Sequence, residues 1–427
     1  MSAPAAVTDH APLTRRTALA GLCVLTLVNL LNYLDRYVIS AVLPDLKAAH
    51  LGLSDFRLGT LMTGFLLVYM LAAPVFGALG DRRSRTRSIA VGVFVWSIAT
   101  ALSGFARNYL QLLAARATVG VGEAAYGTIA PTLLADYFPV TVRGRVFAVF
   151  GMAIPVGAAL GYIVGGLVDH WYGWRAAFFV AGVPGMLLAV AVLALPDPPR
   201  GLQERQARAG ESPVNAPQAR GTLAIYRGLL SHAPYVLTVL GYAAYTFALG
   251  GLAFWMPTFL ERARGVAPAQ ATSAFGAIVV VTGLVGTFAG GWLGDYWLRF
   301  SREAYLWMSG LVTLLAVPVA VVALAARAPS LYYPAIVTAE LLLFMSTGPI
   351  NSAIVNLVAP AERASAIALS VFAIHLLGDV ISPPIIGALS DLGSLQQAVM
   401  IVPAAAALCA LLWMAAARAS AKARLHS

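Results

Sequence analysis

The sequence predicts an all-α membrane protein with twelve transmembrane helices in two pseudo-symmetric six-helix bundles. Three observations support this prediction: an apolar composition, twelve apolar stretches of spanning length, and a charged motif that occurs once in each half. Of the 427 residues, 60% are hydrophobic and 11% are charged, whereas soluble domains average about 45–50% apolar and about 25% charged. So much apolar surface cannot be buried around one aqueous core, so lipid must solvate most of the chain.

The apolar stretches have the length that a membrane requires. An α-helix needs about 20 residues to cross the hydrocarbon core of a bilayer. Short charged or turn-forming loops separate six such stretches, and six more follow a polar segment. The expected spans are residues 17–43, 58–78, 88–106, 109–135, 145–168, 175–195, 233–260, 270–294, 303–326, 331–358, 362–389 and 395–418.

A polar segment separates the two sets of spans. It runs from Pro196 to Arg227, is rich in Pro, Gly, Gln and Arg, and cannot cross a membrane. We therefore expect three parts in the chain. They are an N-terminal six-helix bundle over residues 1–195, a cytoplasmic linker over 196–228 and a C-terminal six-helix bundle over 229–427.

Basic residues gather on one side of the expected membrane. The formal net charge is +10, which in a soluble protein would suggest a nucleic-acid partner. Here the basic residues concentrate in the N-terminal tail, the 82–87 and 143–145 loops, the linker and the C-terminal tail. This bias is typical of cytoplasmic loops. We expect a multi-pass protein of the cell inner membrane, with both termini cytoplasmic and no nucleic-acid partner.

A short charged motif follows the second span and recurs after the eighth. The copies are Gly77-Ala-Leu-Gly80-Asp81-Arg82 with Arg85 beyond it, and Gly291-Trp-Leu-Gly294-Asp295 with Arg299 beyond it. The recurrence indicates an internal duplication, and parallel repeats around a shared site are a known transporter architecture. A loop that is basic only because it faces the cytoplasm would explain the first copy alone, but not the second.

We expect this motif to act as a gate. Its glycines allow a tight turn and the close approach of another helix. Asp81 can accept bonds from a helix N-terminus and from a nearby arginine, which would latch the cytoplasmic sides of the two halves. The second loop lacks the dense arginine run of the first. The expected gating residues are Gly77, Gly80, Asp81, Arg82, Arg85, Gly294, Asp295 and Arg299.

The first and fourth spans contain charged residues, which cost about 2.5–3.5 kcal/mol each to insert into a membrane. In the first span, Asp35 lies beside a polar face, and the fourth span contains Arg116 and Glu123. Arg116 and Glu123 are two turns apart, too far to pair within their helix but placed to address one cavity at two depths. The polar face is formed by Asn29, Asn32, Tyr33 and Arg36.

The charged residues of the first and fourth spans favour proton coupling as the function. A carboxyl group in a partly dry cavity holds its proton more tightly, and a neighbouring arginine opposes this. If Arg116 releases an acid in order to bind substrate, that acid should take up a proton, so we expect Asp35 and Glu123 to be the proton-coupling residues. The alternative is that the charges pair only to lower their insertion cost.

The second half contains a further candidate polar site, formed by Glu340, His375 and Asp379. His375 and Asp379 are four residues apart, so they can meet on one helix face. The pair could relay protons, or it could steady the helix break expected at Ser382-Pro383-Pro384; the sequence leaves both open.

The fifth span contains a glycine-rich face suited to close helix crossing. It resembles the glycine-proline run of drug antiporters, and close packing explains it equally well. Its members are Gly151, Pro155, Gly157, Gly161, Gly165 and Gly166.

Other functions fit the sequence less well. Asp35-Arg36-Tyr37 spells a motif of seven-helix receptors but lies in the first of twelve spans. Asp35 and Asp379 could form an intramembrane protease dyad, but that class lacks duplicated halves. A channel would need a ring of filter residues, and ATP-driven pumping a phosphate-binding loop; neither pattern is visible. We therefore expect no enzyme activity, no metal and no cofactor, with protons as the coupling ion.

Several motifs together resemble the spinster family of the major facilitator superfamily, over residues 29 to 391. The loop motif resembles the superfamily signature. The motifs that resemble the family are Asn32-Tyr33-Leu34-Asp35-Arg36-Tyr37, Ala73-Pro74-Val75-Phe76-Gly77, Val119-Gly120-Val121-Gly122-Glu123-Ala124, Ala130-Pro131-Thr132-Leu133-Leu134-Ala135-Asp136, Ala153-Ile154-Pro155-Val156-Gly157, Leu160-Gly161-Tyr162-Ile163, Glu340-Leu341-Leu342-Leu343 and His375-Leu376-Leu377-Gly378-Asp379.

The resemblance implies the major facilitator fold and an amphiphilic, lipid-like substrate with an anionic or zwitterionic head. Animal members of the family move sphingosine-1-phosphate or lysophospholipids, in some cases coupled to protons. Arg36 and Arg116 would bind the head, with Asn32 and Tyr33 beside them, and Asp35 and Glu123 occupy the family's protonation switch. The other partner would be the bilayer, and the chain would act as a monomer. The alternative is a proton-driven multidrug or small organic-anion transporter of the same fold.

Overall fold

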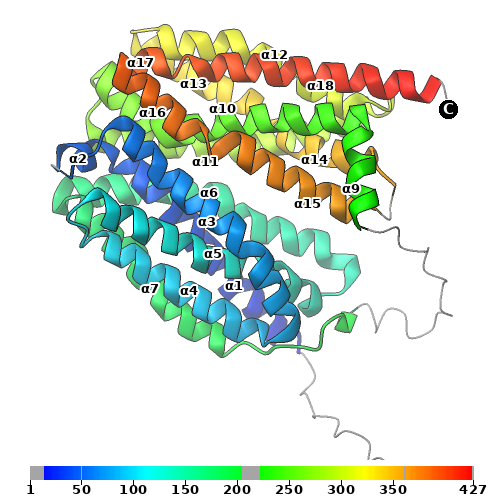
Figure 1. Ribbon diagram of the computed structural model, residues 1–427, viewed down its shortest axis with the longest axis horizontal. Helices are drawn as coiled ribbons and strands as arrows, with labels where there is room; N and C mark the ends of the chain where they lie inside the picture. The colour runs from blue at the N-terminus through cyan, green and yellow to red at the C-terminus, as the bar shows by residue number, and fades with distance from the viewer. Residues whose placement is uncertain (1–13, 50, 204–221, 360–361, 426–427) are drawn as a thin grey trace, which may run out of the picture.

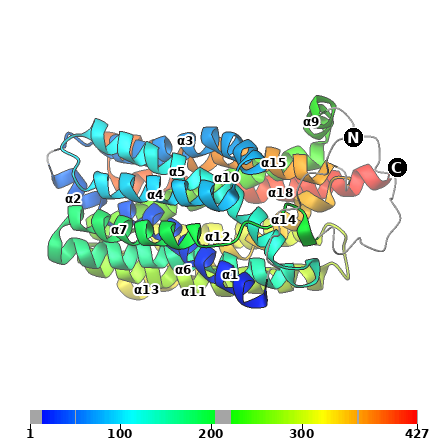
Figure 2. The ribbon, with the colours of Figure 1, turned by 90° about the horizontal axis from the view of Figure 1, so that it is seen from below.

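The computed structural model describes residues 14–49, 51–203, 222–359 and 362–425, and these residues are almost entirely helical. The chain forms two bundles that lie side by side, one from each half of the sequence (Figure 1). The first described helix, Arg15–Ala41, begins toward the same end of the molecule at which the last, Ile401–Leu425, ends (Figure 2). We call this the terminal end, and we call the opposite end, where the short helices α2 (Leu43–Ala48) and α17 (Leu395–Ala398) lie, the far end.

Six long helices make up the first bundle, and four of them begin at a residue whose side chain caps the helix. The side chains of Thr14, Ser54, Ser84 and Asn108 each accept a hydrogen bond from a backbone N–H in the first turn of the helix that follows, which satisfies a group that would otherwise lack a partner. The helices are α1 (Arg15–Ala41), α3 (Asp55–Arg82), α4 (Arg85–Ser103), α5 (Tyr109–Tyr137), α6 (Val140–Tyr172) and α7 (Trp174–Leu193).

The second bundle repeats this plan with more interruptions. Its helices are α9 (Thr222–Ser231), α10 (Ala233–Arg264), α11 (Pro268–Trp297), α12 (Ala304–Ala325), α13 (Pro329–Phe344), α14 (Thr347–Asn356), α15 (Arg363–Ile374), a π-helix η2 (His375–Asp379), α16 (Ser382–Leu392) and α18 (Ile401–Leu425). Among the described residues, eleven helical stretches are long and apolar enough to cross a membrane. The remaining span is α5, whose buried Arg116 and Glu123 make it less apolar. Together they give the expected twelve.

Three expected spans are broken rather than continuous, and the twelfth divides into α17 and α18 at Val399 and Met400. The tenth is interrupted at Met345 and Ser346, between α13 and α14. Here α11 approaches so closely that a Cβ atom added to Gly290 would collide with the Met345 carbonyl. The eleventh divides into α15, η2 and α16, and its second break precedes Ser382-Pro383-Pro384 as the sequence predicted. Proline lacks the N–H that would continue the helical ladder.

The start of the linker lies against the first bundle. Arg85 is buried and donates to Asp136 of α5, to Asp197 at 2.9 Å and to the Pro198 carbonyl. Arg200 donates to the carbonyls of Gly80 and Arg83 at 2.6 Å each. Residues 204–221 of the expected linker lie outside the described residues, and α9 occupies its last part.

The two halves are joined at the far end. Asp55 at the start of α3 accepts hydrogen bonds from Lys47 at 2.7 Å, from Arg262 of α10 at 2.9 and 3.0 Å, and from Ser390 of α16 at 2.7 Å. Asp391 in turn accepts from the first backbone N–H groups of α3 at 2.9 Å. We call Lys47, Asp55, Arg262, Ser390 and Asp391 the far-end gate.

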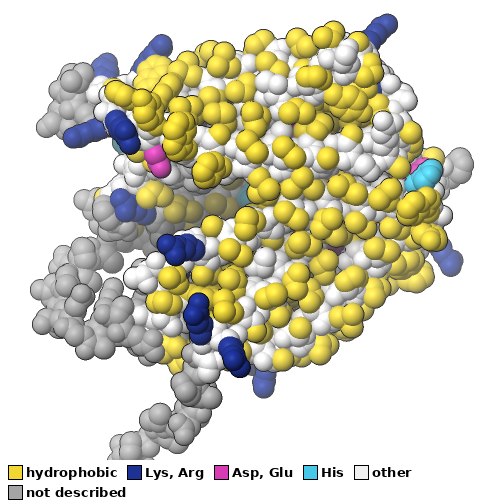
Figure 3. Space-filling model, turned by 180° about the vertical axis from the view of Figure 1, so that it is seen from behind, with side chains coloured by type: hydrophobic (Ala, Val, Ile, Leu, Met, Phe, Trp, Pro, Cys, Tyr) yellow, Lys and Arg dark blue, Asp and Glu magenta, His cyan; other side chains and the backbone are white. Residues whose placement is uncertain are grey.

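Glycines allow this closure. A Cβ on Gly59 of α3 would lie 2.5 Å from the backbone of Pro383, and one on Gly387 of α16 would collide with the Asp55 carbonyl. At the terminal end the halves separate, and a groove opens between them with lysine and arginine side chains near its mouth (Figure 3). The far end is therefore closed and the terminal end open.

Candidate functional site

The charged residues of the first bundle form two ion pairs that cross between helices. Arg36 of α1 donates to Glu123 of α5 at 2.7 Å, and Arg116 of α5 donates to Asp35 of α1 at 3.1 Å. Thr100 of α4 donates to the second oxygen of Asp35. Each helix thus supplies one cation and one carboxylate. We call Asp35, Arg36, Arg116 and Glu123 the charge cluster.

The members of the charge cluster differ in how much of their surface is exposed. Asp35 is 1% exposed, and Arg116 and Glu123 are fully buried, whereas the Arg36 side chain keeps 14% of its surface. The sequence predicted that these residues line a cavity. In this conformation the two acids and Arg116 lie in the seam between α1, α4 and α5, because each is covered by its own ion-pair partner and by the neighbouring helices. Only Arg36 has a partly accessible side chain.

Several polar atoms of the charge cluster have no hydrogen-bond partner among the described residues. They are Nε of Arg36, Nε and Nη2 of Arg116, and Oε1 of Glu123. A buried polar group left unpaired costs about 1–3 kcal/mol. The two ion pairs therefore do not satisfy all the polar atoms of the charge cluster.

Three aromatic rings surround the Arg36 guanidinium, and we call Tyr33, Phe65 and Tyr69 the aromatic sleeve. The guanidinium carbon lies 4.9 Å from the ring centre of Tyr33, 5.0 Å from that of Phe65 and 5.7 Å from that of Tyr69. Such contacts are attractive, and more so where water is excluded. Phe65 and Tyr69 lie on α3, and sequence reasoning missed them because a single aromatic in an apolar span gives no signal of its own.

The asparagines of the first span have separate roles. Asn29 donates to the Phe150 carbonyl of α6 at 3.0 Å and so joins α1 to α6. Asn32, predicted to bind substrate, is 4% exposed, and its amide nitrogen has no partner among the described residues.

The candidate polar site of the second half falls into two parts. His375 Nδ1 lies 3.0 Å from both Asp379 oxygens within η2, and the two side chains keep 24% and 21% of their surface. Glu340 of α13 is 7% exposed and accepts a long bond of 3.4 Å from Thr282 of α11. Neither His375 nor Asp379 bonds to Glu340. A π-helix inside an α-helical span is rare, and those that occur are often found at functional sites. No sequence pattern predicted this one.

The two gating motifs differ in the structure. Gly80 packs against Ile129 of α5, while Asp81 and Arg82 are exposed, and no described residue bonds to Asp81. Gly294 packs against Tyr305, whose hydroxyl donates to Asp295 at 2.6 Å, and Arg299 lies over the Tyr296 ring. A Cβ on Gly77 would meet nothing within 4 Å. The latch expected at Asp81 is not formed in this state, because the halves have separated at its end of the molecule.

Sequence reasoning also missed the far-end gate. Its residues are scattered over α2, α3, α10 and α16. The only signal was local: Ser54 followed by Asp55, a cap and an acid at a helix start.

Comparisons with known proteins agree with this architecture. The model of the Major Facilitator Superfamily matches residues 25–378. "Protein spinster homolog 1" of Xenopus laevis is 36% identical over 387 residues, which cover 86% of this chain and 72% of that protein. The chain belongs to the spinster family of the major facilitator superfamily.

Two further relatives of this spinster-family transporter are informative. A sphingosine-1-phosphate transporter of Xenopus tropicalis is 35% identical over 403 residues, covering 90% of this chain and 76% of its own. The crystal structure of a bacterial homologue of the human lysosomal transporter spinster, inward-facing and unoccupied, shares the fold with a TM-score of 0.83 at 23% identity. The match covers 96% of this chain and 98% of that one.

Proposed function

We propose that this chain carries an amphiphilic, lipid-like molecule with an anionic or zwitterionic head across the cell inner membrane, coupled to protons. The observation that carries the proposal is the charge cluster in the middle of the first bundle. An ionisable group within a membrane span is costly and is retained for function. Four such groups in one seam, one of them with a partly exposed edge, provide both an anion-binding cation and protonatable acids.

Arg36 is the proposed first contact of the substrate head. It is the exposed member of the charge cluster, and its flat guanidinium suits a phosphate or carboxylate. The aromatic sleeve excludes water from one side and so strengthens the attraction. A relative named as a sphingosine-1-phosphate transporter supports a phosphorylated amphiphile as the substrate class.

Proton coupling follows from competition for Arg36. An anionic head that pairs with Arg36 weakens the Arg36–Glu123 pair, and a buried carboxylate without its cation then favours the protonated form. Arg116 and Asp35 form the second pair behind the first and would respond in the same way. His375 and Asp379, on the opposite half, are the proposed second polar contact.

Alternating access would present this site to one side of the membrane at a time. The basic loops at the terminal end support a cytoplasmic position for that end and for both termini. One chain contains both halves and the whole charge cluster, so we propose that it acts as a monomer.

Transport by the purified protein in proteoliposomes tests the proposal. Uptake of a labelled lysophospholipid should rise when a pH gradient is imposed and fall when a protonophore removes it. The variant Arg36→Ala should lose most of this uptake, and Arg302→Ala, an exposed arginine on the second half, should keep it. Uptake that is indifferent to the gradient would exclude proton coupling. Transport of cationic dyes without lysophospholipid would identify a multidrug transporter instead.

A further inference from the structure

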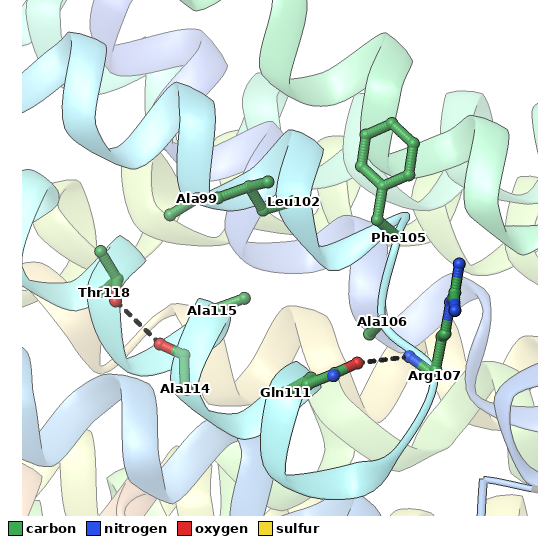
Figure 4. Close-up of a pocket in the computed structure, with 9 residues that line it drawn as sticks. All are labelled: Ala99, Leu102, Phe105, Ala106, Arg107, Gln111, Ala114, Ala115 and Thr118. Atoms are coloured by element: carbon green, nitrogen blue, oxygen red, sulfur yellow. Dashed lines mark hydrogen bonds between the residues drawn. The ribbon is translucent and has the colours of Figure 1, made fainter.

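A hollow of about 550 Å³ lies on the outer surface of the first bundle, between α4 and α5 at the far end. Small side chains create it, since its walls include Ala99, Ala106 and Ala115, and Leu102 and Phe105 stand beside them with 54% and 65% of their surface exposed. Figure 4 shows these residues around an open space between the two helices. The hollow is separate from the groove between the halves.

The hollow is apolar along its length and basic at one end. Arg107 and Gln111 stand at the rim, in the loop before α5 and in its first turn. None of the nine lining residues is acidic. Arg107 is exposed, and within the described parts of the chain its guanidinium has neither a hydrogen bond nor an ion pair. The Gln111 side-chain oxygen accepts from the Arg107 backbone N–H at 2.8 Å, which leaves the amide NH₂ as a second donor.

The dimensions fit one leaflet of a membrane. From Gln111 to Thr118, at the inner end of the lining, is seven residues, or about 10 Å along the helix. One leaflet contributes about 15 Å of hydrocarbon. The Thr118 hydroxyl donates to the Ala114 carbonyl at 2.8 Å and so presents no free donor at the inner end.

We propose that this hollow binds one phospholipid with an anionic head from the far-end leaflet, its phosphate on Arg107 and Gln111 and one acyl chain between α4 and α5. Both donors lie at the rim, where the head group would sit, and the alanine walls leave room for a chain beyond them. Arg175 holds the rim in shape, because it donates to the carbonyls of Gly104 and Ala106 at 2.7 and 2.9 Å.

Two residues that line the hollow are neighbours in sequence of residues that bond to Asp35 of the charge cluster. Ala99 precedes Thr100, and Ala115 precedes Arg116, the two residues that bond to Asp35. A bound chain would fill the space outside the two helices that hold this pair. Lipid occupancy should therefore stabilise the protein against thermal unfolding.

The test uses the full chain and two lipids, phosphatidylglycerol and phosphatidylcholine. Native mass spectrometry should find phosphatidylglycerol retained in preference to phosphatidylcholine. Arg107→Gln should lower this preference about fivefold, the worth of one arginine near an anionic lipid surface. The matched control is Arg327→Gln, because Arg327 is an exposed arginine in the α12–α13 loop, which corresponds to the α4–α5 loop in the other half.

A second variant tests whether an acyl chain occupies the hollow. Ala114→Phe fills the hollow from an exposed lining position, and it should reduce retention of both lipids and remove the thermal stabilisation by phosphatidylglycerol. Equal losses in Arg107→Gln and Arg327→Gln would show only general attraction to anionic lipid and would overturn the proposal. So would an Ala114→Phe variant with unchanged retention, or a photo-crosslinker at Phe105 that captures a second chain rather than lipid.

Discussion

Arg36 and Arg116 carry the same charge but occupy different surroundings. Arg36 keeps a partly accessible edge and contacts three aromatic rings, whereas Arg116 is fully buried, bonds to Asp35 and lies over the Phe65 ring. The sequence predicted a head-group role for both. Their burial suggests a division, in which Arg36 meets the substrate and Arg116 sets the state of the carboxylate behind it.

Glu123→Gln should reproduce permanent protonation of this residue. The neutral amide keeps the size of the side chain and weakens its hold on Arg36, so the balance between the two access states should lose most of its pH dependence. Spin-label distances across both ends, measured between about pH 5 and pH 8, would report this. Glu303→Gln, a glutamate outside the charge cluster at the start of α12, is the matched control. A variant whose distances still follow pH as in the native protein would exclude Glu123 as the switch.

Arg116→Ala should destabilise the protein strongly. It leaves Asp35 buried without its cation, and removal of one partner from a buried pair costs about 3–5 kcal/mol. The double variant Asp35→Leu, Arg116→Met should recover most of the loss, since it leaves no unpaired charge. Thermal unfolding in detergent compares the three proteins. An Arg116→Ala protein as stable as the native one would show that the pair contributes little.

At the scale of single helices, the fifth span shows what its small residues do. Gly157, Gly161 and Gly165 of α6 pack against α1, and Gly166 packs against Thr272 of α11 in the other half. A Cβ atom added to Gly151, at the start of the same run, would meet nothing within 4 Å. The glycine-rich face is thus a contact surface over its later part only.

Gly161→Val should therefore disrupt the bundle, and Gly151→Val should not. A Cβ at Gly161 would lie 2.6 Å from the Leu34 carbonyl, which belongs to the helix backbone and cannot move aside. The expected cost is about 1–3 kcal/mol, as for overpacking of a close contact. The yield of monodisperse protein and its unfolding temperature would show the difference. Equal behaviour of the two variants would contradict the packing assignment.

The helices themselves were predictable from the sequence, because a span is a local property of length and hydropathy. The twelve expected spans overlap the observed helices, and the break at Ser382-Pro383-Pro384 followed from proline chemistry. The break at Met345 was not predictable, since it depends on the approach of Gly290 from α11. The pairing of Arg36 with Glu123 was equally hidden, because residues 87 positions apart meet only after α1 and α5 have packed.

At the scale of the whole molecule, one end is closed by side chains and the other is open. The far-end gate joins α3 to α10 and α16 through Asp55, and the groove opens at the terminal end (Figure 3). Access to the other side requires these bonds to break and the two halves to close around the groove.

Asp55→Asn should shift the balance toward opening at the far end. The amide cannot form the ion pairs with Lys47 and Arg262, although it keeps the size of the side chain. Spin labels at Phe56 of α3 and Leu392 of α16, both exposed, should report a longer and broader distance distribution. Glu303→Gln, at the start of α12, should leave that distribution unchanged. An unaltered distance in Asp55→Asn would mean that packing of the glycines alone closes this end.

The charge cluster is electrically neutral, since its two guanidinium groups balance its two carboxylates. Under the proposed coupling, a proton taken up by Glu123 leaves one unit of positive charge uncompensated at Arg36. A negatively charged molecule binds better to such a site, and by thermodynamic reciprocity its arrival increases the affinity for the proton. Cargo and proton would then be loaded as cooperating ligands and would move in the same direction, so an inward proton gradient would drive accumulation of the substrate rather than its expulsion.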